Sequence, residues 1–244
     1  MSKERCTVIL LAAGSGKRMQ SKTAKQFIEI NGRPLICYPL DTIERSEVID
    51  DCILVTGAED IPYVQTEIVD KYGYTKVKAI VAGGRERWES VAKGLQGEYQ
   101  PGEYVFIHDG ARAFVTEKIF KDTFEDVKKY KACVAAVRSK DTVKIADENG
   151  FVSATPNRKD VWIVQTPQVF ERGLITQAYR IQMQLAAKHG FDSVTITDDA
   201  SAVESICLQK IKFTESDYRN IKVTTPEDLE IAKIYLQEMA QKDV

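Results

Sequence analysis

Hydrophobic residues in this chain fall into short continuous runs that alternate with segments of helical period. The runs resemble strands buried on both faces of a sheet, and they cover residues 7–12, 52–55, 77–81, 104–108 and 133–137. Three intervening segments carry apolar stripes at spacings of three and four residues: Ile61, Val64 and Ile68; Trp88, Val91, Ala92 and Leu95; and Ile119, Phe120, Phe124 and Val127. This alternation predicts an α/β fold with a mostly parallel sheet and crossover helices.

The last helix is marked at its start and along one face. Thr225 is a suitable N-cap, and Pro226 suits the first helical position because its missing N–H has no intrahelical partner there. A single apolar stripe follows, formed by Leu229, Ala232, Leu236 and Met239. We expect this helix to close the domain.

One segment departs from the alternation of strands and helices. Two strand-like stretches, 142–145 and 151–154, flank residues 147–150, which end in Asn149-Gly150, a strong hairpin signal. A two-stranded ribbon is marginally stable alone in water, so it needs another surface. That surface can belong to a second subunit or to the same domain. We expect one domain over residues 1–244 with a β-arm at 138–160, and the sequence pattern alone supports both of these contact surfaces equally.

Composition and charge narrow the class of protein. The 244 residues include 34 Lys and Arg against 36 Asp and Glu, so the net charge of −2 predicts no general attraction to nucleic acid or to a membrane surface. No apolar run approaches the ~20 residues that span a bilayer. The first strand begins too early to leave room for a signal peptide, and we therefore expect a cytoplasmic protein. The cysteines lack the close pairs of a zinc site, so we expect buried, reduced thiols at Cys6, Cys37, Cys52, Cys133 and Cys207.

The loop after the first run is the strongest candidate for a binding site. Gly14 and Gly16 allow backbone N–H groups to turn toward phosphate oxygens, while Arg18 and Lys25 supply positive charge. The loop lies at the carboxyl end of a buried strand, where open α/β sheets bind ligands. Met19 replaces the third glycine of the dinucleotide-binding motif, and no P-loop pattern fits. The alternative is a tight turn with two solvated cations.

A second candidate follows the run 104–108. Asp109 would lie at the same edge of the sheet as the glycine loop, and a carboxylate facing bound phosphates suits Mg²⁺. The alternative for Asp109 is an Asx turn or a helix cap. We interpret His108 as a structural, hydrogen-bonded imidazole rather than a catalytic base.

Paired glycines at 83–84 form the third candidate. They permit close approach of a flat ligand to the backbone, and Ser90 follows one turn inside a helix, an arrangement that suits a base or a ribose. Further polar clusters lie next to expected elements, at Arg158, 166–168, 195–199 and 220–224. Each of these alone is better explained by a cap, a turn or a solvated face than by a site.

Taken together, these segments resemble the 2-C-methyl-D-erythritol 4-phosphate cytidylyltransferases of the non-mevalonate isoprenoid pathway. The resemblance covers nearly the whole chain and rests on short motifs in the family's order: A-A-G-x-G-x-R-M at 12–19, K-Q at 25–26, G-G-x-x-R-x-x-S at 83–90, H-D-x-A-R at 108–112, D-T at 141–142, T-P-Q at 166–168, T-D-D-A-S at 197–201 and N-I-K-V-T at 220–224. It implies a Rossmann-like sheet with helices on both faces, a protruding β-hairpin arm and a homodimer formed through that arm. It also implies transfer of CMP from CTP to a sugar-alcohol phosphate, with Mg²⁺ as cofactor.

The resemblance also implies roles for individual residues. The catalytic cations would be Arg18, Lys25 and Lys222, and Asp109 would bind Mg²⁺. The nucleotide would contact Ala12, Ala13, Gly14, Ser15, Gly16, Gly84, Arg87 and Ser90. The acceptor phosphate would be surrounded by Arg112, Thr142, Arg158, Thr166 and Thr197, of which Thr142 and Arg158 can serve the neighbouring subunit.

The chain departs from the family pattern at Leu11, Ala24 and Ala113, where proline is common. Ala24 and Ala113 change loop rigidity rather than charge, so they bear on loop order and turnover more than on reaction type. Other functions remain open at this point: a ribitol 5-phosphate cytidylyltransferase, a sugar-1-phosphate nucleotidyltransferase, a catalytically silent nucleotide-binding homologue, or a dinucleotide-dependent oxidoreductase.

Overall fold

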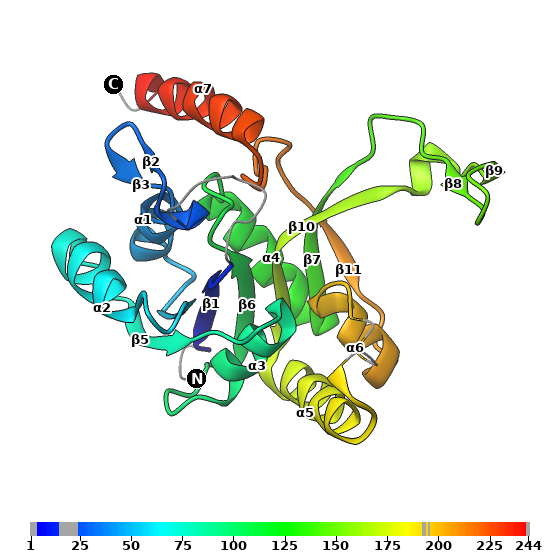
Figure 1. The fold of residues 1–244 in the computed structure, drawn as a ribbon, viewed down its shortest axis with the longest axis horizontal. Helices are drawn as coiled ribbons and strands as arrows, with labels where there is room; N and C mark the ends of the chain where they lie inside the picture. Colours follow the sequence, from blue (N-terminus) through cyan, green and yellow to red (C-terminus); the bar gives the residue numbers. More distant parts are fainter. Residues whose placement is uncertain (1–3, 15–23, 192–193, 195, 243–244) are drawn as a thin grey trace.

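The computed structural model describes residues 4–14, 24–191, 194 and 196–242, with side chains to residue 238. Within these ranges the chain forms a seven-stranded sheet in the order β11-β7-β10-β6-β1-β4-β5 (Figure 1). The five strands expected for the main sheet are present: β1 (Cys6–Ala12), β4 (Asp51–Thr56), β5 (Val77–Ala82), β6 (Tyr104–Asp109) and β7 (Ala132–Arg138). β1 pairs in parallel with both β4 and β6, so the mostly parallel α/β sheet is confirmed.

Two strands of the sheet were not expected from the sequence. β10 (Trp162–Glu171) runs antiparallel between β6 and β7, and β11 (Lys212–Glu215) pairs in parallel with β7. Pro167 and its polar neighbours interrupt the apolar pattern of β10, and the register of β10 on β7 shifts between Val164 and Gln168. Proline and polar residues are unusual inside a central strand, which explains why this one escaped prediction.

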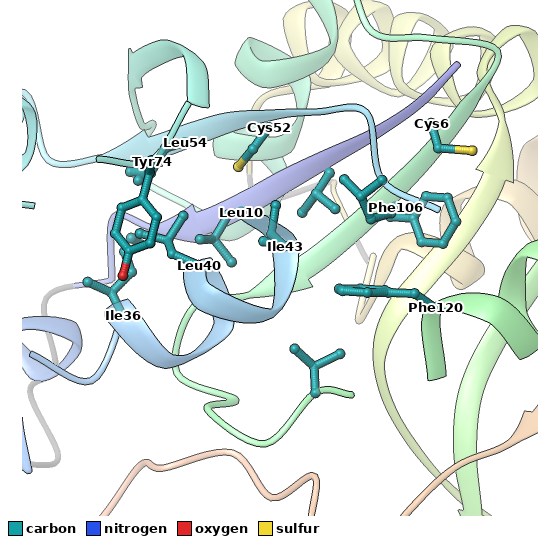
Figure 2. Packing of buried hydrophobic residues seen from close by; sticks show 14 of the residues in the cluster. Cys6, Leu10, Ile36, Leu40, Ile43, Cys52, Leu54, Tyr74, Phe106 and Phe120 are labelled. Atoms are coloured by element: carbon teal, nitrogen blue, oxygen red, sulfur yellow. The ribbon is translucent and has the colours of Figure 1, made fainter. Parts of the chain in front are cut away.

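Helices cover both faces of the sheet. One face packs against α1 (Cys37–Arg45), α4 (Glu117–Tyr130) and the π-helix η3 (Val64–Asp70), which continues the short helix α2 (Ile61–Tyr63). Figure 2 shows this core, where Leu40 and Ile43 of α1 lie over Leu10 of β1. The other face packs against α3 (Arg87–Gln96), α5 (Arg172–His189) and α6 (Asp199–Cys207). The first predicted helical stripe therefore spans α2 and η3, and the other two belong to α3 and α4.

A smaller apolar cluster lies beyond the carboxyl edge of the sheet. The short strands β2 (Glu29–Ile30) and β3 (Arg33–Pro34), which follow the 3-10 helix η2 (Lys25–Phe27), pack there with α7 (Pro226–Lys242) (Figure 1). Ala232 and Leu236 of α7 are buried as predicted. The Thr225 hydroxyl accepts a hydrogen bond from the Asp228 amide, which confirms the predicted N-cap. Met239 lies outside the residues whose side chains the structure describes.

The arm extends away from the body between β7 and β10 (Figure 1). It contains β8 (Ile145–Ala146), β9 (Val152–Ala154) and the 3-10 helix η4 (Arg158–Asp160). β8 and β9 pair antiparallel, so the hairpin is confirmed, but the expected strand over 142–144 is wrong. The ribbon of β8 and β9 has no third strand beside it among the described residues. Because an isolated two-stranded ribbon is marginally stable, its strand pairing covers only a few residues and does not extend to 142–144.

None of the five cysteines, all of which the structure describes, forms a disulfide; Cys6, Cys37, Cys52 and Cys133 are buried, and Cys207 is half-buried. The prediction of buried thiols without disulfides is confirmed for four of them, whereas Cys207 is more exposed than expected because it lies at the end of α6. Among the helices that the structure describes, none is both long and apolar enough to cross a membrane.

Candidate active site

The site lies at the carboxyl ends of β1 and β6, where the strand order of the sheet reverses direction. Such a switch point leaves a crevice, because consecutive crossover connections leave it on opposite sides. A cavity of about 440 Å³ opens here. Its lining includes six of the residues assigned above to the nucleotide, namely Ala12, Ala13, Gly14, Gly84, Arg87 and Ser90. Lys25, Asp109 and Lys222 also line it.

The paired glycines form a tight part of the cavity wall. A Cβ atom added at Gly83 would lie 2.4 Å from Cβ of Ala13, and one added at Gly84 would lie 2.2 Å from Cβ of Glu89. The Gly84 amide donates to the Ser90 hydroxyl at 3.0 Å. Only glycine therefore fits at these two positions, because neighbouring protein atoms leave no room for a Cβ. The close approach of a flat ligand to this backbone stays a prediction.

Asp109 is the charged centre of the site. Its Oδ2 atom lies 2.8 Å from Nζ of Lys222 and 3.7 Å from Nε of Arg112, while Oδ1 lies 3.3 Å from Nε of Arg87. Burial alone would raise the pKa of Asp109, but Arg87, Lys222 and Arg112 hold it well below its usual range. Asp109 is therefore a carboxylate at any physiological pH, and three cations converge on it.

A second cavity of about 320 Å³ adjoins the first across Arg87, Asp109 and Lys222. It contains three residues assigned above to the acceptor phosphate, Arg112, Thr166 and Thr197. The sequence analysis assigned no individual role to the other residues that line this second cavity, which are Val164, Gln165, Gln168 and Asp198. Four of these seven residues come from β10, the strand that the apolar pattern did not reveal.

His108 has the structural role that we predicted. Its ring is fully buried, with Nε2 at 3.2 Å from the Arg112 carbonyl oxygen and Nδ1 at 3.1 Å from the Thr166 hydroxyl. Burial lowers the pKa of His108 to about 4, so the imidazole is neutral. The same Thr166 hydroxyl accepts a hydrogen bond from the Asp109 amide at 3.0 Å. His108 thus fixes β6 to β10 behind the cavities.

Some predicted site residues are not brought together. Thr142 and Arg158 are exposed on the arm and line neither cavity, and the Arg158 guanidinium donates to the Lys140 carbonyl oxygen at 3.4 Å. Ser15, Gly16 and Arg18 lie outside the described residues. The positions of Thr142 and Arg158 follow from the arm's direction, which leads away from the body of the same chain (Figure 1).

Asp199 and Tyr179 lie behind Arg87 without having been assigned a role. The Asp199 carboxylate accepts from the Arg87 guanidinium at 2.8 Å and from the Tyr179 hydroxyl at 2.5 Å. Asp199 had appeared only within the polar cluster 195–199. Tyr179 gave no signal because it lies mid-helix, on the buried face of α5.

The donor set fits a metal ion only when phosphates complete the coordination. Among the described residues, no group of three or more His, Cys, Asp or Glu side chains could hold a metal. Asp109 supplies one ionised carboxylate on a cavity wall. Mg²⁺ is commonly held by one or two carboxylates together with substrate phosphates and water, so it fits this position.

Comparison with known proteins decides the family. The family model described as 2-C-methyl-D-erythritol 4-phosphate cytidylyltransferase matches residues 6–238. The chain belongs to this family. It is 47% identical over 231 residues to the 2-C-methyl-D-erythritol 4-phosphate cytidylyltransferase of Lachnospira eligens, covering 95% of this chain and 99% of that protein. It is 42% identical over 233 residues to that of Clostridium botulinum, covering 96% and 98%.

A solved structure carries the same family likeness. The 4-diphosphocytidyl-2C-methyl-D-erythritol synthase from Anaerococcus prevotii superposes with a TM-score of 0.81 at 35% identity, covering 96% of this chain and 99% of that one. Membership in the cytidylyltransferase family removes the dinucleotide-dependent oxidoreductase from the candidate functions. It also agrees with the sheet order and the Rossmann-like architecture described above.

Proposed function

We propose that this chain transfers CMP from CTP to 2-C-methyl-D-erythritol 4-phosphate, giving 4-diphosphocytidyl-2-C-methyl-D-erythritol and pyrophosphate, a step of isoprenoid precursor biosynthesis. The observation that supports this most directly is the pair of cavities that meet at Arg87, Asp109 and Lys222. The glycine-walled cavity would take the nucleotide, and the cavity beside Arg112 would take the acceptor. The two phosphate groups would then meet at the shared wall.

Charge is the main obstacle to this reaction. Two anions ~4 Å apart repel by ~4 kcal/mol per unit pair at an effective dielectric constant of 20, so two phosphoesters resist close approach. Lys25, Arg87 and Lys222 line the nucleotide cavity, and Arg112 lines the acceptor cavity. These cations would attract both reactants and stabilise charge that develops in the transition state. Arg18 belongs to the same proposal through the family motif.

The chemistry needs alignment more than activation. An oxygen of the acceptor phosphate attacks the α-phosphorus of CTP, a new phosphorus–oxygen bond forms, and the bond to the pyrophosphate leaving group breaks. The acceptor phosphate is already a nucleophile at neutral pH, so no serine, cysteine or strong base is required. The neutral, buried His108 accords with this scheme, because it lines neither cavity. Catalysis is then positioning and electrostatic stabilisation.

Magnesium completes the proposal. Asp109 would hold the ion on the wall common to the two cavities, and the bound ion would neutralise charge on the phosphates. Lys222, which contacts the same carboxylate, would then be released toward the phosphates. This assignment rests on the chemistry of a single ionised carboxylate beside a cavity that suits a triphosphate.

We further propose a homodimer formed through the arm. Its exposed apolar side chains, Ile145, Phe151 and Val152, are the kind that a partner surface buries. Thr142 and Arg158 would then reach the acceptor cavity of the neighbouring subunit, because they are remote from that cavity in their own chain. The arm's outward direction supports this arrangement over one in which the hairpin folds back on its own domain (Figure 1).

A panel of acceptors tests the function. The purified chain is mixed with Mg²⁺, CTP or UTP, and one acceptor at a time: 2-C-methyl-D-erythritol 4-phosphate, ribitol 5-phosphate or a sugar 1-phosphate. Pyrophosphate release is then measured. We expect release with CTP and methylerythritol phosphate. Preferential release with ribitol 5-phosphate would move the function to the rival cytidylyltransferase, and silence with every acceptor would support a catalytically silent homologue.

A further inference from the structure

Arg87 is held between two carboxylates from different parts of the chain. Its Nε atom lies 3.3 Å from Oδ1 of Asp109, and one terminal nitrogen, NH2, lies 2.8 Å from Oδ2 of Asp199. Its side chain is 32% exposed, and it lines both cavities. Among the contacts described, Arg87 alone connects Asp109, on the wall shared by the two cavities, to the Asp199 carboxylate behind that wall.

Asp199 is not itself a cavity residue. It is fully buried at the first turn of α6, and its other oxygen accepts from the Tyr179 hydroxyl of α5 at 2.5 Å. Burial and the neighbouring Asp199 raise the pKa of Tyr179 well above its usual value, so this hydroxyl always carries its proton. A buried carboxylate is costly unless its partners compensate it. Here the compensation comes from Tyr179 and from Arg87.

The arrangement controls where the positive charge of Arg87 points. Arginine forms strong two-pronged pairs with a single carboxylate. Without the Asp199 contact, the guanidinium could turn fully onto Asp109 and pair with both of its oxygens. Asp109 would then be neutralised and the charge of Arg87 withdrawn from the cavities. The ion pair between Asp199 and the NH2 nitrogen of Arg87 opposes that rotation.

We propose that Asp199, braced by the Tyr179 hydroxyl, is a positioning residue that holds the Arg87 guanidinium at the wall shared by the two cavities; this rests on the function proposed above. Asp199 and Tyr179 touch neither substrate. They act through Arg87, and they set the share of its charge that reaches the reacting phosphates.

A double-mutant cycle tests the proposal. Asp199→Asn keeps the size of the side chain and removes its charge. We expect kcat/KM for both substrates to fall about 10- to 100-fold, the usual cost of losing an outer partner of a site residue. In an Arg87→Ala background the same change should alter kcat/KM by no more than about twofold, because the group on which Asp199 acts is gone. Tyr179→Phe should give a smaller loss that also disappears in that background.

Asp51 provides a matched control at the opposite edge of the sheet. It too is a buried aspartate with an arginine and hydroxyl groups as partners: Arg5 at 3.0 Å, the Thr7 hydroxyl at 2.5 Å and the Tyr99 hydroxyl. Asp51→Asn should lower the melting temperature while leaving kcat/KM unchanged. If Asp199→Asn does not fold, the cycle is run with Tyr179→Phe and Arg87→Ala.

The outcomes separate this inference from the function on which it rests. Equal losses of kcat/KM in the native and Arg87→Ala backgrounds would overturn the positioning role, as would an equal loss in Asp51→Asn. An active native chain whose activity is unaffected by Asp199→Asn would overturn it alone. A native chain that releases no pyrophosphate would overturn the proposed function, and this inference with it.

Discussion

The Nζ atom of Lys222 lies 2.8 Å from Oδ2 of Asp109, although the two residues belong to distant parts of the chain. Asp109 ends β6 in the centre of the sheet, while Lys222 lies in the loop before α7. The Val223 amide donates to the Ala111 carbonyl oxygen at 2.9 Å, which fixes this loop beside the end of β6. A lysine at 34% exposure can both pair with the carboxylate and reach into the cavity.

Lys222→Ala should lower turnover with little effect on the fold. Removing one charged group aimed at a transition state costs on the order of 10²–10³ in kcat. The measurement is kcat for pyrophosphate release, with circular dichroism to verify folding. Lys118→Ala is the control, because Lys118 is an exposed lysine paired with Asp122 on the surface of α4. Native turnover in Lys222→Ala would remove this residue from the catalytic set.

Gly84→Ala should weaken nucleotide binding. The new Cβ would lie 2.2 Å from Cβ of Glu89, so the wall of the cavity would have to shift. We expect a rise in the KM for CTP of about tenfold or more, which corresponds to ~1.4 kcal/mol. Gly173→Ala is the matched control, because a Cβ there meets nothing within 4 Å, and alanine inside a helix stabilises by roughly 0.5–1 kcal/mol. An unchanged KM in Gly84→Ala would argue against this wall as the nucleotide contact.

Asp228→Ala should destabilise the chain in a pH-dependent way. The Asp228 carboxylate accepts from the amides of Thr224 and Thr225 at 2.8 and 2.9 Å, in a capping box at the start of α7. Burial raises the pKa of Asp228, but these hydrogen bonds outweigh it and lower the value overall. A lowered folded-state pKa gives stability that is present above the unfolded value, about 3.9, and is lost as the pH falls through the folded value.

Urea unfolding at several pH values measures this effect. At pH 7 we expect Asp228→Ala to lower the free energy of unfolding by ~1 kcal/mol, as is typical for the loss of a helix cap. The free energies of unfolding of the variant and the native chain should become equal as the pH falls below about 4, because the carboxylate is protonated there. Glu230→Ala, on the exposed face of α7, is the control and should lower the free energy of unfolding by no more than about 0.5 kcal/mol. A constant difference across the whole pH range would contradict the capping role.

Phe151→Asp should convert the proposed dimer into monomers. Phe151 is 72% exposed at the tip of the arm, and a charge buried at its place in an interface would be unpaired. Light scattering should give the chain mass of 27.5 kDa for the variant and twice that mass for the native chain. Leu208→Asp introduces the same charge at an 85% exposed leucine beyond α6 and should leave the dimer intact. A native chain that is monomeric at every concentration measured would contradict the dimer proposal.

The thiols should react in two classes. Cys207 is half-buried, while Cys6, Cys37, Cys52 and Cys133 are buried. Burial raises the pKa of the Cys133 thiol to about 12, and thiolates are the reactive form. A thiol reagent such as Ellman's should therefore label Cys207 slowly in the native chain and all five cysteines after unfolding. Rapid labelling of several native thiols would contradict the burial described.

The sequence predicted those parts of the fold that carry a clear hydrophobic period. β1, β4, β5, β6 and β7 are continuous apolar runs, and each was expected within one or two residues of its bounds. β10 was not expected, because a polar stretch with Pro167 lies within it. Its strand character comes from pairing with β6 and β7 on both sides. Such tertiary pairing overrides local propensity and leaves no local signal.

The site shows the same division. Asp109 and the glycine pair could be found because strand ends and glycines have a direct meaning in an α/β sheet. Asp199 and Tyr179 could not be given roles, since their function depends on the approach of α5 and α6 to Arg87. The sequence pattern does not reveal that α5 and α6 come close to Arg87 in the fold. The roles proposed for Thr142 and Arg158 likewise depend on the proposed partner subunit, so no pattern within one chain could locate the cavity that they would reach.

The two halves of β10 belong to different neighbourhoods. Trp162 and Val164 pair with β7 at the root of the arm, whereas Gln168 pairs with both β6 and β7. Between them, the Thr166 hydroxyl contacts the Asp109 amide. Strand β10 therefore connects the root of the arm directly to the backbone of Asp109. If the proposed dimer forms through the arm, assembly and turnover would be coupled through this strand, and a ligand bound at the root of the arm would inhibit turnover without entering either cavity.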